Sequence, residues 1–283
     1  MGNKMTHKQY TWKQAEEATV PLFRSQIYLM DKMAQSVNKD YIASNKLFAF
    51  RELCLGCLLI GRNNSEATLC LIKDNLVDQV HYISRNTFEM MVILYYIDND
   101  KLKRDELAQR FFDYQSIVSY QAKQVMTDYP ESFIGIRTEE NDREVEQNHN
   151  AFILKYTQDG KKPDLKSWSG KNLYSMIACL TDKKLKDDLM KRYQVMIKAN
   201  NNYLHPTIQS LRQSIIKYLE GEIDYKFRVM QLHSIITSVD LIILKFLEQF
   251  PKGRIAFLKQ HDDIVAGHNE VVNSAKDAGL LDT

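Results

Sequence analysis

Two charged residues with helical spacing, Arg85 and Glu89, are the first candidates for chemistry in this sequence. Residues four apart lie one above the other on a helix, so the guanidinium and the carboxylate can pair or act together. The helix that carries them becomes apolar on all sides from Phe88 onward, which is typical of a helix surrounded by protein. A buried charge must be paired or must bind something, because an unpaired buried charge is costly. Both alternatives stay open here: a structural ion pair, or part of a site.

A histidine at a predicted helix break is the second candidate. His205 lies in the run Asn201-Asn202-Tyr203-Leu204-His205-Pro206. The short amides weaken a helix, and Pro206 has no amide hydrogen to donate, so the helix kinks or restarts there. Histidine titrates near neutral pH and therefore suits general acid–base catalysis. The alternative is that the ring caps a helix or fills the core.

A loop around Trp168-Ser169-Gly170-Lys171-Asn172 is the third candidate. Trp168 and Lys171, together with Tyr203 beside the histidine, are expected to contact a substrate. The segment is not a phosphate-binding loop, because no glycine-rich run precedes the lysine. A loop that is simply pinned in place by its tryptophan is the alternative.

Other motifs give no metal or cofactor site, and none is expected. Cys54-x-x-Cys57 lies in an apolar helix without a second ligand pair, so it does not predict zinc. Glu146-x-x-His149 has the spacing of a di-iron ligand pair, but the sequence contains no second Glu-x-x-His.

The composition predicts a soluble, cytoplasmic helical protein. Gly and Pro number only 10 and 5 among 283 residues, too few for many strands joined by tight turns. The net charge of +2 implies no general affinity for nucleic acid. No secretory signal is recognisable, no apolar run of about 18 residues predicts a membrane span, and the four cysteines suit a reducing cytosol.

Hydrophobic periodicity predicts an all-α bundle of about eight to ten helices in one domain, residues 1–283. The core is expected at 41–250, an insertion at 128–171, and peripheral C-terminal helices at 254–283. Arg62-Asn63-Asn64-Ser65 predicts a helix break with a cap. The expected helices are 12–37, 41–62, 66–98, 102–127, 139–157, 172–180, one from 182, 207–220, 224–250 and a loose pair from 254.

In this order, the motifs resemble an uncharacterised family of helical bacterial proteins, a domain of unknown function. The first is an Arg-x-x-x-Glu motif at 85–89 within a helix, and the second is an Arg-Phe-x-x-Tyr helix at 110–114. The Trp-x-Gly loop at Trp168 follows, and the last elements are Tyr193, Asn201 and the His205-Pro206 pair. The resemblance covers about residues 45–220 and implies no particular activity.

A more distant likeness is to the HEPN superfamily of helical, often dimeric proteins, many of which are metal-independent ribonucleases in defence and toxin systems. Their signature is an Arg followed, after four to six residues, by a His. His205 would be that histidine, but positions 198–200 are Lys198, Ala199 and Asn200. Lys198 has the charge but not the bidentate geometry of a guanidinium.

The resemblance implies a metal-independent endoribonuclease or toxin-type effector in antiviral defence, acting on RNA as a homodimer. His205 would be the general acid–base, Arg85 or Lys198 would stabilise the phosphorane charge, Asn202 would orient the substrate, and Glu89 would hold Arg85. The alternative is a non-catalytic binding or sensor module with a protein partner from its own operon. In that module Arg85, Glu89 and His205 would form a structural clasp.

Overall fold

The computed structural model of the chain describes residues 10–37, 48–128, 139–199, 224–251 and 253–281. Within these ranges the regular structure is helical, and the β-structure is limited to one isolated bridge between Gln158 and Lys161. The predicted all-α multi-helix bundle is therefore confirmed.

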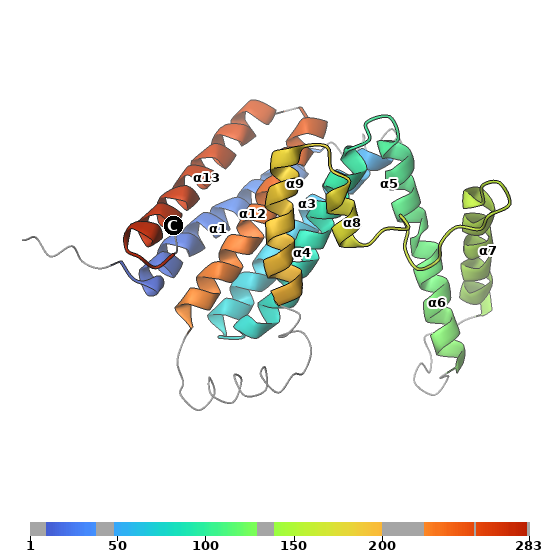
Figure 1. Cartoon of the computed structure of the whole chain (residues 1–283), viewed down its shortest axis with the longest axis horizontal. Coiled ribbons are helices and arrows are strands. Elements are labelled where there is room, and N and C mark those ends of the chain that lie inside the picture. The colour runs from blue at the N-terminus through green and yellow to red at the C-terminus, as the bar shows by residue number, and fades with distance from the viewer. Residues whose placement is uncertain (1–9, 38–47, 129–138, 200–223, 252, 282–283) are drawn as a thin grey trace, which may run out of the picture.

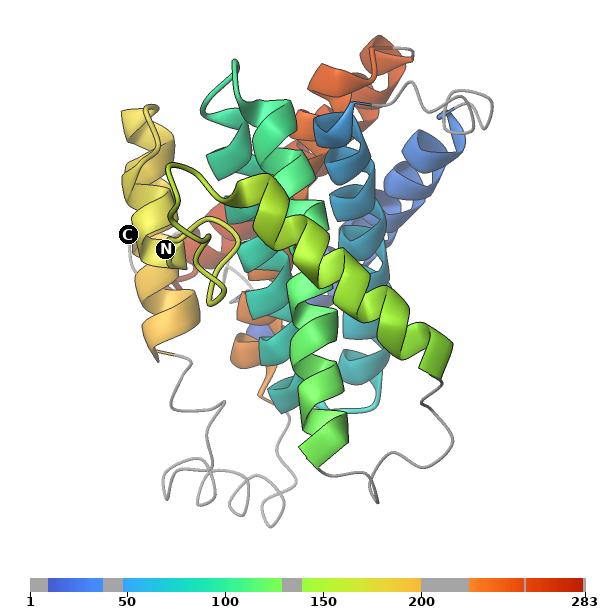
Figure 2. The same ribbon diagram turned by 90° about the vertical axis from the view of Figure 1, so that its right-hand side faces the viewer.

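Helix α12 (Tyr225–Gln249) lies at the centre of the bundle. The long helices α1 (Trp12–Gln35), α3 (Ala49–Lys73) and α4 (Val77–Asp98) pack against it. Helix α13 (Arg254–Asp277) lies along α1 and also contacts α12, as the ribbons in Figures 1 and 2 show. The middle of the hydrophobic core is formed by fully buried side chains of α12, which include Leu232, Ile235, Val239, Ile242 and Ile243.

Local signals set the ends of α12. The Asp224 carboxylate accepts a hydrogen bond from the amide of Phe227, 2.9 Å away, and so caps the first turn. Pro251 and Gly253 follow the last turn, and Gly253 has a left-handed φ of 75°. By length and mean hydropathy (1.4) this helix has the composition of a membrane span, and 56% of that apolar window is buried inside the bundle. The central helix of a helical bundle has the same composition.

A buried ion pair joins α12 to α4. The Lys245 ammonium lies 2.8 Å from the Asp98 carboxylate, and their side chains are only 11% and 5% exposed. Lys101 pairs with the same carboxylate at 2.5 Å, and Glu248 accepts from Lys245 at 2.9 Å. The desolvated lysine therefore has two acceptors, which raise its pKa against the lowering effect of burial.

The predicted break at residues 62–65 is wrong. Helix α3 continues through this segment, because Ser65 and Thr68 donate their hydroxyl hydrogens to carbonyls one turn earlier and stay inside the helix. The chain breaks at Asp74–Leu76 instead. Asn75 has a φ of 57°, and the amide of Leu76 reaches back to the carbonyl of Leu71 at 2.7 Å, which ends the helix.

The predicted helix 102–127 consists of two helices that meet at Tyr114, α5 (Arg104–Asp113) and α6 (Gln115–Asp128). The predicted helix 139–157 is α7 (Glu139–Tyr156), which packs chiefly against α6. Helices α6 and α7 form an arm that stands away from the central bundle in Figure 1. The predicted insertion, residues 128–171, begins at the end of α6 and includes α7, so it covers only the second helix of this arm.

Two short helices and a π-helical turn follow the arm. Helix α8 (Leu173–Ala178) is capped by Asn172, and α9 (Lys183–Tyr193) is capped by Asp182. The π-helical segment Gln194–Ala199 continues α9 directly. Single π-helical turns occur frequently at functional sites.

The C-terminal segment is one long helix rather than the expected loose pair of peripheral helices. Helix α13 approaches α1 closely at Gly267, where an added Cβ would lie 2.8 Å from the Leu22 Cδ2. A glycine at this position lets the two helices pack against each other. Helix α13 therefore belongs to the wall of the bundle.

Replacing Asp98 by alanine is expected to lower the free energy of unfolding by about 3 kcal/mol, because Lys245 would keep its burial and lose its enclosed acceptor. The matched control is Glu248→Ala, since Glu248 contacts the same ammonium from a side chain that is 41% exposed. The control should cost less than about 1 kcal/mol. Urea denaturation followed by circular dichroism measures both, and equal losses would contradict the prediction.

Candidate functional site

Arg85 and Glu89 form the predicted ion pair, with the guanidinium Nε 2.8 Å from a carboxylate oxygen. Their side chains are 37% and 36% exposed, so the expectation that the helix is surrounded at this point is wrong. The apolar residues that suggested it, such as Phe88 and Met91, face the core, and Arg85 and Glu89 lie at the partly exposed edge of that face. A pair of this kind on one helix contributes only about 0.3–0.5 kcal/mol.

The remaining predicted catalytic residues are not placed by the structure. His205 and Asn202 lie outside the described residues, and so does Tyr203, which is predicted to contact a substrate. Lys198 belongs to the π-helical segment Gln194–Ala199, and its side chain is also outside the described part of the chain. An approach of His205 to Arg85 and Glu89 therefore stays a prediction.

Trp168 is 6% exposed and packs edge-on against Tyr96 and Phe111, with ring centroids 5.9 and 5.3 Å away. These contacts fix the loop to the bundle, as in the alternative of a pinned loop. Lys171 is half-buried, and its carbonyl accepts hydrogen bonds from Ser167 and Ser169. A contact of either side chain with a substrate stays a prediction.

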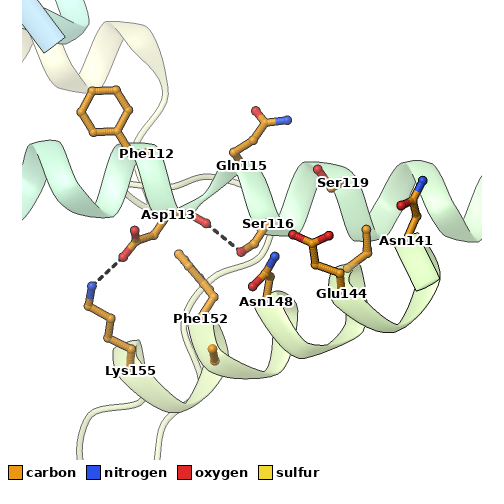
Figure 3. Close-up of a pocket in the computed structure, with 12 residues that line it drawn as sticks. Phe112, Asp113, Gln115, Ser116, Ser119, Asn141, Glu144, Asn148, Phe152 and Lys155 are labelled. Atoms are coloured by element: carbon orange, nitrogen blue, oxygen red, sulfur yellow. Dashed lines mark hydrogen bonds and ion pairs between the residues drawn. The ribbon is translucent and has the colours of Figure 1, made fainter. Parts of the chain in front are cut away.

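A cleft of about 690 Å³ lies between the two helices of the arm. Figure 3 shows Asn141, Glu144 and Asn148 of α7 directed toward Ser116 and Ser119 of α6. These side chains are half-buried or exposed, so water satisfies their polar atoms at little cost. The cleft has the polar character of an open surface.

The charges at one end of the cleft are engaged with each other. Asp113 accepts from Lys155 at 2.7 Å, from the Tyr156 hydroxyl at 2.8 Å and from Gln109 at 2.7 Å. Although burial alone would raise the pKa of this carboxyl, the three donors lower it below its usual value. The cluster fastens α7 to the end of α5, and the charges of Asp113 and Lys155 are paired with each other.

A second hollow, of about 480 Å³, lies between helices of the bundle, opens partly to solvent and is mainly apolar. Four helices line it: α1, α9 with its π-helical extension, α12 and α13. The apolar wall comes chiefly from α12 and α13, and includes Val229, Met230, Val271, Val272 and Ala275. Enclosed apolar pockets with a few polar groups are the usual sites for small molecules.

Two histidines from different helices meet in this cavity. The Nδ1 of His233 on α12 lies 3.0 Å from the Nε2 of His268 on α13. Burial, the neighbouring His268 and the charge of Arg192 lower the pKa of His233 to about 4, and Asp240 opposes them. Burial also lowers the pKa of His268. Both rings are therefore neutral at physiological pH, and one donates to the other.

Arg192 of α9 brings a positive charge to the cavity. Its Nη2 donates to the Ser238 hydroxyl at 2.6 Å and to the Ser234 carbonyl at 3.3 Å, and its guanidinium lies 5.4 Å from the centre of the Phe88 ring. All three partners are neutral. Burial lowers the pKa of Arg192. The negative charges of the more distant Asp188 and Asp240 partly offset this lowering.

Hydrogen bonds behind the cavity hold its α12 wall in place. The side-chain amide of Gln26 donates to Asp240 at 2.7 Å, and His261 lies 3.2 Å from the same carboxylate. On the α4 side, Ser84 donates to Gln231 at 2.8 Å. These contacts tie α12 to α1, α13 and α4, so the polar groups of the cavity sit on fixed supports.

The sequence model of a family of unknown function, DUF5677, matches residues 51–223 of the chain. The chain belongs to this family. The match confirms the predicted resemblance to an uncharacterised family, while the HEPN likeness stays a prediction. No curated protein and no solved structure matches the chain.

The DUF5677 segment contains Arg192 and the Phe88 ring against which it packs, whereas His233 and His268 lie beyond it. These cavity residues were not among the predicted site residues. One signal was present in the sequence: Gln231, His233, Ser234 and Ser238 are polar residues within a mainly apolar segment. A polar run on a buried helix has to find hydrogen-bond partners within the protein.

The neutral histidine predicts a specific loss of stability in acid. The unfolded His233 binds a proton below pH 6.5, but the native ring does so only near pH 4, so protons favour unfolding as the pH falls between these values. Because part of the His233 ring is exposed to solvent, which screens it, between pH 7 and pH 5 the wild type should lose about 1 kcal/mol more of its unfolding free energy than His233→Gln.

Urea denaturation at the two pH values measures this difference. The titratable groups near the ring, Arg192, Asp240 and His268, are retained in the variant. The control His149→Gln alters a half-buried ring that stacks on Tyr120 in the arm, and it should follow the wild type. Parallel losses in wild type and His233→Gln would contradict the neutral pair.

Proposed function

We propose that this DUF5677 protein is a helical binding module that takes up a small, mainly apolar molecule in the cavity between α1, α9, α12 and α13. The observation that carries the proposal is the half-open, largely apolar cavity of about 480 Å³, a volume within the range of small-molecule sites. Transfer of an apolar ligand from water into such a space gains roughly 25 cal/mol for each Å² buried.

The position of the cavity suits a sensor. Its wall includes residues from four helices that are far apart in the chain, such as Ala15, Arg192, Met230 and Val272. A ligand there contacts all four helices at once and stabilises their packing by mass action. Binding would therefore favour one arrangement of α9 and α13 relative to α12, which a partner protein can recognise.

A metal-independent endoribonuclease is the second candidate. The specific observation in its favour is the π-helical segment Gln194–Ala199, because π-helical turns are frequent at functional sites and this one carries Lys198. His205, six residues after the end of that segment, would serve as the general acid–base in cleavage at a ribose 2′-hydroxyl. RNA is the substrate that this candidate requires.

Filling the cavity tests the binding module. Val272→Trp puts an indole into the space and should weaken binding of the neutral fluorescent probe N-phenyl-1-naphthylamine at least tenfold, as measured by fluorescence titration. The matched control is Val118→Trp, since Val118 is 44% exposed on α6 in the arm. The control should bind like the wild type. Equal binding by all three proteins, or none by the wild type, would reject the proposal.

Expression in a bacterium tests the ribonuclease. Wild type should fragment cellular RNA and slow growth, and His205→Ala should abolish both effects, because the general acid–base would be gone. His149→Ala, which removes a ring from the arm, should leave both effects unchanged. Intact RNA with the wild type, or undiminished cleavage by His205→Ala, would exclude this candidate.

A further inference from the structure

The side of the Arg192 guanidinium that faces the cavity indicates which molecules the cavity takes. The guanidinium has five N–H donors, and among the described residues its hydrogen bonds are made by Nη2, to the Ser238 hydroxyl and the Ser234 carbonyl. Within the described ranges no carboxylate lies within ion-pair distance of it. The Asp240 carboxylate is already engaged by Gln26 and His261.

The other charges on the cavity lining do not neutralise this cation. Asp188 and Lys191 both line the cavity and are exposed, with opposite signs. His233 and His268 are both in the wall and are held together as a neutral pair. The lining is left with one net positive charge, and that charge is the guanidinium on the side of α9.

The surroundings of Arg192 favour a planar anion. The Phe88 ring lies 5.4 Å from the guanidinium and supports it, while two hydrogen bonds fix the orientation of Nη2. A guanidinium held in this way can present its remaining N–H groups to the two oxygens of a carboxylate or of a sulfonate. The rest of the wall, such as Val271, Val272 and Met230, is apolar.

From this arrangement we infer that the ligand is an amphipathic organic anion, whose acid group pairs with Arg192 while its apolar body fills the space between α12 and α13. The inference rests on the proposed binding function and specifies its ligand. The neutral pair of His233 and His268 offers hydrogen-bonding groups beside the anion, and it adds no second positive charge to the site.

Two fluorescent probes that differ by one charged group test the inference. 8-Anilinonaphthalene-1-sulfonate has the same aromatic body as neutral N-phenyl-1-naphthylamine and carries an added sulfonate. The wild type should bind the sulfonate at least about tenfold more tightly than the neutral probe, which is the size expected of a charge-assisted pair. Arg192→Gln should remove this preference and change the affinity for the neutral probe less than threefold.

Control variants distinguish pairing with Arg192 from a general effect of positive charge and from misfolding. Lys184→Gln removes an exposed positive charge from the same helix outside the cavity and should keep the preference. Arg192→Lys should keep part of it, because the charge remains and the planar fork is lost. In the wild type, decanoate should displace the neutral probe at a concentration at least about tenfold lower than decanol, a comparison that needs no variant.

The outcomes separate this inference from the proposal on which it rests. Equal affinity for the two probes, with both weakened by Val272→Trp, would overturn the anionic ligand and leave the binding module standing. A preference for the sulfonate that survives in Arg192→Gln would also overturn it. Failure of both probes to bind the wild type would instead reject the binding module itself.

Discussion

The enclosure of α12 by other helices is the constraint on which the rest of this structure depends. Once the central helix is buried, each polar group on it has to be paired inside the protein. Lys245 pairs with Asp98 of α4, Arg228 with Glu16 of α1, and Asp240 with Gln26 and His261. These pairs join α12 to α1, α4 and α13 at specific positions along its length, so they constrain the register of the bundle as well as its stability.

Much of the fold could be predicted from the sequence, because long periodic segments report their own helicity. The observed limits of α1, α7 and α12 lie within two residues of the predicted ones. The predicted break at Arg62–Ser65 failed because Ser65 fits inside the helix by donating to the preceding turn, and the Asn64 side chain donates to Asn86 and Thr87 of α4. The observed break depends on a left-handed Asn75, which no propensity identifies in advance.

The candidate site was less accessible to sequence reasoning. The pairing of Arg85 with Glu89 follows from their spacing, but their exposure depends on which side of α4 faces the core. The cavity joins residues from α1, α9, α12 and α13 that are up to some 260 positions apart in the chain, for example Ala15 and Ala275. Periodicity shows which face of each helix is buried, but it does not show which buried faces leave a space between them.

The DUF5677 segment ends at residue 223, before α12 begins, and this boundary divides the cavity. The guanidinium and the Phe88 ring beneath it are encoded inside the segment, while the histidine pair and most of the apolar wall are encoded after it. Membership of DUF5677 therefore rests on sequence that includes one wall of the cavity and leaves out most of the other. What this chain accommodates depends on both walls together.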